Sequence, residues 1–129
     1  MLNYLNRIDF THPALGGGFG PGYKVAFGRD LVGDYYTPRR NAVPKTIPMD
    51  CIGHGTHVAG IIAASNDPFV AGISPAVTLG IYKVFGCNYE TEDDILIQAF
   101  DEAESAGVDI ISASLGAPGG WSEGYVVPC

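Results

Sequence analysis

Positive charge and uninterrupted apolar segments are scarce in this chain of 129 residues. Seven lysines and arginines stand against 14 acidic residues, and the formal net charge is −7. This sign is unfavourable for binding phosphates or anionic lipid, so we expect neither nucleic acid nor a membrane as a partner. The longest apolar-rich stretch, residues 69–85, is interrupted by Pro75 and Lys83, and residues 1–7 contain no apolar core. The sequence therefore predicts neither a membrane span nor a signal peptide.

Cysteine is rare as well. Cys51, Cys87 and Cys129 are the three cysteines of the chain, so at most one pair can form a disulfide within it. Their spacing lacks the short C-x-x-C steps of a zinc knuckle. We therefore expect no metal centre and no cofactor, and the cysteines leave the redox compartment open.

Glycine and proline, by contrast, are abundant, with 18 and nine residues. This composition excludes a helical bundle and predicts many turns. The chain is loop-rich up to Pro48, with one strand expected over residues 23–27. The glycine-rich run of residues 16–22 does not have the G-x-G-x-x-G spacing of a phosphate loop, and Pro21 lacks an N–H group. We expect a turn there.

Regular elements are expected in the second part of the chain. Residues 53–64 have the pattern of a helix, and residues 77–85 are rich in β-branched and aromatic residues, which is typical of a strand. The buried side of this helix is expected to carry Val58, Ile61 and Ile62.

A second helix is expected after Thr91, which can cap it together with Asp94. Gly107 is expected to end this helix. Residues 108–113 then form another strand, whose almost continuous apolar character indicates cover on both faces. The apolar stripe of the second helix is expected to consist of Ile95, Leu96, Ala99, Phe100, Ala103 and Ala106.

Helix, strand, helix and strand in this order predict an α/β fold with a parallel sheet and right-handed crossovers. In such sheets, ligands bind at the carboxyl ends of the strands. The loop of residues 114–120 follows the last predicted strand, so it lies on the expected functional edge.

The position of one histidine in the sequence favours a catalytic role. His54 lies between Gly53 and Gly55 at the start of the first predicted helix, and glycines on both sides leave the imidazole accessible. A histidine without such neighbours is more often structural, but here the pattern favours a general base. Thr56 is expected to make a local hydrogen bond through its hydroxyl group.

A metal site is the alternative for this helix. His54 and His57 share a helix face at spacing i, i+3, but a zinc site needs a third ligand, and Gly55 and Thr56 stand where a metalloprotease would carry its glutamate. We therefore expect His57 to be a hydrogen-bonded core residue.

Residues 54–60 read His-Gly-Thr-His-Val-Ala-Gly, which resembles the histidine motif of the subtilisin-like serine proteases. Residues 8–15 resemble the segment just after the catalytic aspartate of that family, and residues 24–34 resemble its large secreted fungal and bacterial members. Residues 112–116 resemble its Ser-Leu-Gly substrate strand.

The resemblance implies part of the three-layer α/β fold of the subtilisin-like family, incomplete in this chain. It implies that His54 is the catalytic base and that Ser114, Leu115 and Gly116 bind the backbone of a peptide or protein substrate as an added strand. It also implies an extracellular location.

The chain departs from the family at its two other catalytic positions. Leu5, Asn6 and Arg7 stand where Asp-Thr-Gly belongs, so we expect the orienting acid and the first strand of the sheet to be missing. Asp9 comes four residues late and is expected to organise a turn. Asp50 is expected to approach from the wrong element to orient His54.

The segment with the nucleophilic serine is expected beyond Gly120, and none of Ser112, Ser114 and Ser122 fits that role. We therefore expect residues 1–129 to be a partial peptidase domain without its Asp and Ser segments, and inactive alone. We also expect a truncated or misassembled product with a false start near Met1 and a join within residues 124–129.

Two other functions stay open. One is a non-catalytic remnant that binds extended peptides along residues 114–116. The other is an unrelated metal-binding α/β module that uses His54 and His57.

Overall fold

A computed structural model describes residues 1–65 and 67–116 of the chain, with the side chains of residues 3–5 left undescribed. Helices and strands alternate after the loop-rich first part, as predicted. In chain order, the described elements are β1 (Leu2–Leu5), the 3-10 helix η1 (Pro13–Leu15), β2 (Val25–Asp30), α1 (His54–Ala63), β3 (Leu79–Lys83), α2 (Asp93–Ser105) and β4 (Ile110–Ser112).

The four strands of the described part form one parallel sheet in the order β2-β3-β1-β4. The expectation of a missing first strand is wrong, because β1 lies inside this sheet and pairs Leu2 with Leu79 of β3 and with Ile110 of β4. The motif comparison used side-chain identities, whereas a strand inserts through main-chain N–H and C=O groups that find partners on both sides. Residues that differ from the motif therefore still complete the sheet.

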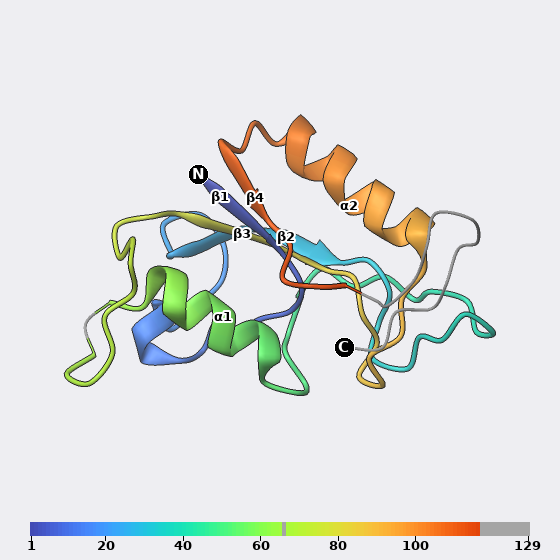
Figure 1. The fold of residues 1–129 in the computed structure, drawn as a ribbon, viewed down its shortest axis with the longest axis horizontal. Helices are drawn as coiled ribbons and strands as arrows, with labels where there is room; N and C mark the ends of the chain where they lie inside the picture. Colours follow the sequence, from blue (N-terminus) through green and yellow to red (C-terminus); the bar gives the residue numbers. More distant parts are fainter. Residues whose placement is uncertain (66, 117–129) are drawn as a thin grey trace.

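The molecule has three layers, with α1 on one face of the sheet and α2 on the other (Figure 1). Along β3, Leu79 and Ile81 belong to the core on the α1 side, whereas Tyr82 belongs to the core on the α2 side. This division follows from the alternation of side chains along a strand. It confirms the predicted α/β fold with a parallel sheet covered by helices.

The prediction for the buried side of α1 is confirmed in part, because Val58 and Ile62 are partly buried and pack against the core. The buried residues of this helix are Gly55, Ala59 and Ala63, while Ile61 is 52% exposed. Small residues let the helix axis approach the sheet closely, so the face made of glycine and alanine turns inward and the branched side chains lie at its flanks.

The second helix begins one residue later than the predicted cap. Its N-cap is Glu92, which makes no side-chain capping bond, and Thr91 is fully buried instead. Gly107 has a φ of 70°, as expected for the residue that ends a helix. Of the predicted apolar stripe, Ile95, Ala99 and Ala103 are buried, Leu96 is partly buried, and Phe100 and Ala106 are exposed.

Strand β4 is shorter and more exposed than predicted. It has three residues and occupies one edge of the described sheet, and Ile110 is 60% exposed. The prediction that both faces are covered is therefore wrong for the described residues. No helix of the described residues is long and apolar enough to cross a membrane.

Candidate functional site

The helix that begins with His54 is placed by two glycines with different roles. Gly53, the N-cap of α1, has a φ of 105°, a conformation that side chains disfavour. Gly55 permits close approach, because a Cβ atom there would lie 1.9 Å from the carbonyl oxygen of Arg7. His54 is thereby held next to the segment that leaves the carboxyl end of β1.

Asp50 fixes the first turn of α1. Its carboxylate accepts hydrogen bonds from the N–H groups of Ile52, Gly53 and Thr56, at 2.9 to 3.0 Å, and from the Thr56 hydroxyl. Burial alone would raise the pKa of the Asp50 carboxyl, but the hydrogen bonds from Gly53, Thr56 and Ile52 outweigh it and hold this pKa below its ordinary value. Among the described residues, Asp50 makes no hydrogen bond to His54. The hydroxyl group of Thr56 makes the local hydrogen bond that was predicted.

The imidazole of His54 has an amide for a neighbour. Nδ2 of Asn6 lies 3.0 Å from Nδ1 of His54, and Asn6 is fully buried. The motif places Leu5 at the position of the orienting aspartate, and that assignment stays a prediction because the side chain of Leu5 lies outside the described ones. Asn6 was missed although a usable signal existed, since it directly follows a strand that ends at the functional edge.

His54 and the predicted substrate strand line the same cavity. This cavity has a volume of about 390 Å³ and is lined by His54, Tyr89, Ser114, Leu115 and Gly116. The structure thus brings together residues that lie 60 positions apart in the sequence, at the carboxyl edge of the sheet. Tyr89, in the loop after β3, was not predicted, although the same edge rule points to that loop.

Arg7 packs against Tyr89, which lines this cavity. Its guanidinium carbon lies 5.2 Å from the centre of the Tyr89 ring and 5.8 Å from that of Phe85. Nη1 of Arg7 donates to the carbonyl oxygen of Gly86 at 2.6 Å, and Nε lies 3.6 Å from Oδ1 of Asp50. One buried cation therefore connects β1, the start of α1 and the loop after β3.

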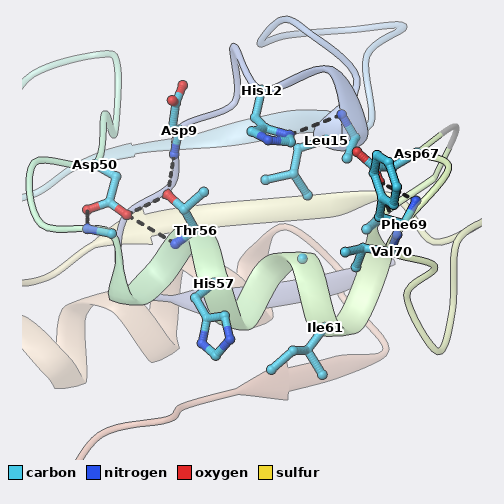
Figure 2. A pocket seen from close by; sticks show the side chains of 14 residues that line it. Asp9, His12, Leu15, Asp50, Thr56, His57, Ile61, Asp67, Phe69 and Val70 are labelled. Atoms are coloured by element: carbon cyan, nitrogen blue, oxygen red, sulfur yellow. Dashed lines mark hydrogen bonds between the residues drawn. The ribbon is translucent and has the colours of Figure 1, made fainter.

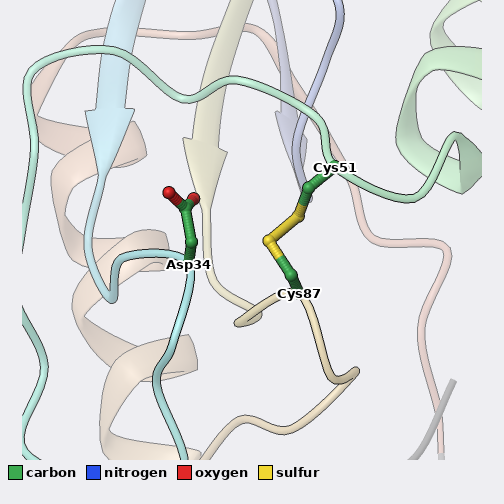
Figure 3. A group of neighbouring side chains, drawn as sticks. All are labelled: Asp34, Cys51 and Cys87. Carbon is green, nitrogen blue, oxygen red and sulfur yellow. A yellow bond between two sulfur atoms is a disulfide. The ribbon is translucent and has the colours of Figure 1, made fainter.

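A disulfide joins the loop before α1 to the loop after β3. Cys51 and Cys87 are bonded (Figure 3), which uses the one pair that three cysteines allow; Cys129 lies outside the described residues. Asp34 lies beside this bond, and the three side chains are the one group within the described residues with metal-ligand spacing. The carboxylate of Asp34 pairs with Lys45 and Lys83, and hydrogen bonds from these two side chains hold its pKa below the ordinary value.

A second, larger cavity of about 730 Å³ lies along α1 (Figure 2). His57 and Ile61 line it, together with Phe69 and Val70 of the following loop. His57 is exposed, so the prediction of a core histidine is wrong. His54 and His57 line different cavities, which argues against the two-histidine metal site.

The polar side chains around the larger cavity serve local structure. Oδ1 of Asp9 accepts hydrogen bonds from the N–H and hydroxyl groups of Thr11, which is the turn expected for Asp9. Nδ1 of His12 accepts from the N–H of Ala14, and Oδ1 of Asp67 accepts from the N–H groups of Phe69 and Val70. These polar groups are therefore engaged in turns and in the cap of η1.

Of the serines considered from the sequence, Ser112 ends β4 and Ser114 lines the His54 cavity. Ser122 and the proposed join within residues 124–129 lie outside the described residues.

Known proteins match this chain over most of its length. The chain is 34% identical over 110 residues to the minor extracellular protease Vpr of Bacillus subtilis, which covers 84% of this chain and 13% of Vpr. It is 47% identical over 70 residues to an intracellular serine protease of Paenibacillus polymyxa, 54% of this chain and 22% of that protein. The chain thus spans only a minor part of these relatives.

A solved protease structure also matches this chain in its fold. The nisin leader peptidase NisP from Lactococcus lactis superimposes with a TM-score of 0.72 at 27% identity, and the match covers 98% of this chain and 35% of NisP. The fold is therefore part of a subtilisin-like fold. The model of the subtilase family matches residues 8–127, and this chain belongs to the subtilase family.

Proposed function

We propose that this chain forms part of a subtilisin-like serine endopeptidase domain that binds peptide or protein substrates. In this proposal, His54 is the general base, and Ser114, Leu115 and Gly116 bind the backbone of an extended substrate. The cavity that these residues share is the observation that carries it. A segment that directly follows an edge strand is well placed to pair with an extended peptide through main-chain hydrogen bonds.

We further propose that the chain by itself binds peptides without cleaving them. Peptide hydrolysis by a serine protease requires a nucleophile, a base and a carboxylate that orients the base. In the described residues, an amide rather than a carboxylate contacts Nδ1 of His54. The same observation favours the second candidate function, a non-catalytic domain that binds extended peptides.

The relatives include an extracellular and an intracellular protease. We propose an extracellular location, since a disulfide such as Cys51–Cys87 persists mainly in oxidising compartments.

Peptide binding tests the proposal. Fluorescence anisotropy of a labelled peptide with blocked ends would give its dissociation constant for the wild-type chain and for two variants at one position. Gly116→Pro removes one N–H donor, and we expect affinity to fall about tenfold, the effect of one hydrogen bond. Gly116→Ala is the matched control, because nothing lies within 4 Å of the added Cβ and the N–H group is kept.

Equal affinities for the two variants would overturn the assignment of residues 114–116, as would the absence of binding to the wild-type chain. Mass spectrometry of the incubated peptide tests the second part. We expect intact peptide; cleavage that disappears in Ser114→Ala would show that Ser114 is a nucleophile and that the chain is active alone.

A further inference from the structure

We infer that Asn6 is a positioning residue that keeps the proton of the neutral His54 ring on Nε2. His54 then offers a hydrogen-bond donor to the cavity where a peptidase needs a base. This inference deepens the proposed function, because it concerns the protonation of the same site, and its biological meaning rests on that function.

The chemistry of the two contacting atoms carries the inference. The amide nitrogen of asparagine only donates hydrogen bonds, whereas each nitrogen of a neutral imidazole either donates or accepts. Nδ2 of Asn6 lies 3.0 Å from Nδ1 of His54, which is an ordinary hydrogen-bond length. With Nδ2 of the amide facing the imidazole, Nδ1 accepts the hydrogen bond, and the single proton of the neutral ring is left on Nε2.

The elements around Asn6 and His54 hold the two side chains in contact. Asn6 is fully buried and follows directly after β1, which pairs with strands on both sides. His54 begins a helix whose Gly55 lies against the backbone of Arg7, and Asp50 fixes the first turn of that helix. Both ends of the contact are thus attached to rigid elements, so the amide has little freedom to leave Nδ1.

The consequence for catalysis follows from the role of the base. A serine hydroxyl gives its proton to the lone pair on Nε2, which is available only when the other nitrogen carries the ring proton. An aspartate at the orienting position enforces that state by accepting from Nδ1–H. In a serine protease, its replacement by asparagine lowers kcat about 10⁴-fold, through the wrong tautomer. Asn6 places the same restriction on His54.

The tautomer is directly measurable by NMR. The chain labelled with ¹⁵N in its histidine rings would be studied at about pH 9, where imidazoles are ordinarily neutral. Two-bond proton–nitrogen spectra distinguish a protonated ring nitrogen from an unprotonated one, and His54→Gln identifies the His54 signals among those of His12 and His57. We expect Nε2 of His54 to have the protonated chemical shift and Nδ1 the unprotonated one.

Asn6→Asp is the informative variant, because it exchanges the amide for a carboxylate of the same size. We expect the proton of His54 to move to Nδ1 and the two nitrogen shifts to exchange. Asn41→Asp adds the same charge at an exposed residue and is expected to leave the His54 signals unchanged. Loss of packing alone would not exchange the shifts.

Two results would overturn the inference. One is a wild-type spectrum with the proton on Nδ1, which decides the question even if Asn6→Asp fails to fold. The other is a folded Asn6→Asp chain that keeps the proton on Nε2. Peptide binding by the same samples is a separate readout: a chain with the expected tautomer that binds no peptide would contradict the proposed function and leave the role of Asn6 intact.

Discussion

Arg7 packs against the ring of Tyr89, with its guanidinium carbon 5.2 Å from the ring centre and its side chain 1% exposed. Buried arginines are uncommon unless they are paired, and this one contacts Asp50 and the carbonyl oxygen of Gly86 as well. Arg7 thus packs against Tyr89, which lines one wall of the His54 cavity.

Arg7→Met is expected to lower the free energy of unfolding by about 3 kcal/mol, because it leaves the buried carboxylate of Asp50 without its cation. It is also expected to weaken peptide binding, since Tyr89 loses its support. Urea denaturation and the anisotropy assay measure the two effects. The matched control is Arg40→Met: Arg40 is exposed and lies 5.8 Å from the ring of Tyr35. Similar losses in both variants would contradict a special role for Arg7.

The disulfide is expected to stabilise the chain by restricting its unfolded state. Cys51 and Cys87 are 36 positions apart, and loop-closure entropy for this length gives about 4 kcal/mol as an upper value. We expect the double variant Cys51→Ser/Cys87→Ser to lose about 2–4 kcal/mol in urea denaturation. Dithiothreitol should destabilise the wild-type chain by a similar amount and leave the double variant unchanged; an equal effect of dithiothreitol on both would argue against this account.

We expect protonation of Asp50 to destabilise the folded chain in acid. Its folded-state pKa lies below the ordinary value, so its contribution is fully present above the ordinary carboxyl range and is lost as the pH falls through the folded-state pKa. Asp50→Asn is expected to flatten the acid part of the curve of unfolding free energy against pH. Asp101→Asn, at an exposed position of α2, is the control that should keep the wild-type slope. An unchanged slope in Asp50→Asn would refute the assignment.

Much of the architecture could be predicted, because the residue types themselves determine where turns, helix ends and strands form. Glycine at 107, the apolar run of β3 and the turn chemistry of residues 16–22 each determine local structure directly. The edge rule for parallel sheets also placed residues 114–116 near His54 correctly. These features require no knowledge of what packs against them.

The errors concern choices that packing decides. The inward face of α1 could not be read from hydrophobicity, because the sheet selects small residues for close approach and leaves Ile61 outside. Asn6 and His54 lie 48 positions apart in the sequence, so their contact follows from the packing of α1 beside the segment after β1 and not from a local pattern. Tyr89 and Arg7 are in contact although they lie 82 positions apart in the sequence, so no local sequence pattern could predict this contact.

A second buried cation gives a last prediction. Lys83 and Asp30 are both fully buried, and Nζ of Lys83 lies 3.0 Å from Oδ2 of Asp30. Oδ1 of Asp30 accepts from the N–H groups of Val32 and Gly33, so this carboxylate also shapes the turn after β2.

Lys83→Met should therefore cost about 3–5 kcal/mol of unfolding free energy, because the carboxylate of Asp30 stays buried without its cation. The double variant Lys83→Met/Asp30→Asn removes that charge as well, and we expect it to recover part of the loss. Lys45→Met is the comparison within the same network: Lys45 pairs with Asp34, which Lys83 also contacts, but it does so at the surface, where ion pairs contribute little. Chemical denaturation of the four chains tests the argument: if the double variant is less stable than Lys83→Met, the destabilisation arises from lost packing rather than from an unpaired charge.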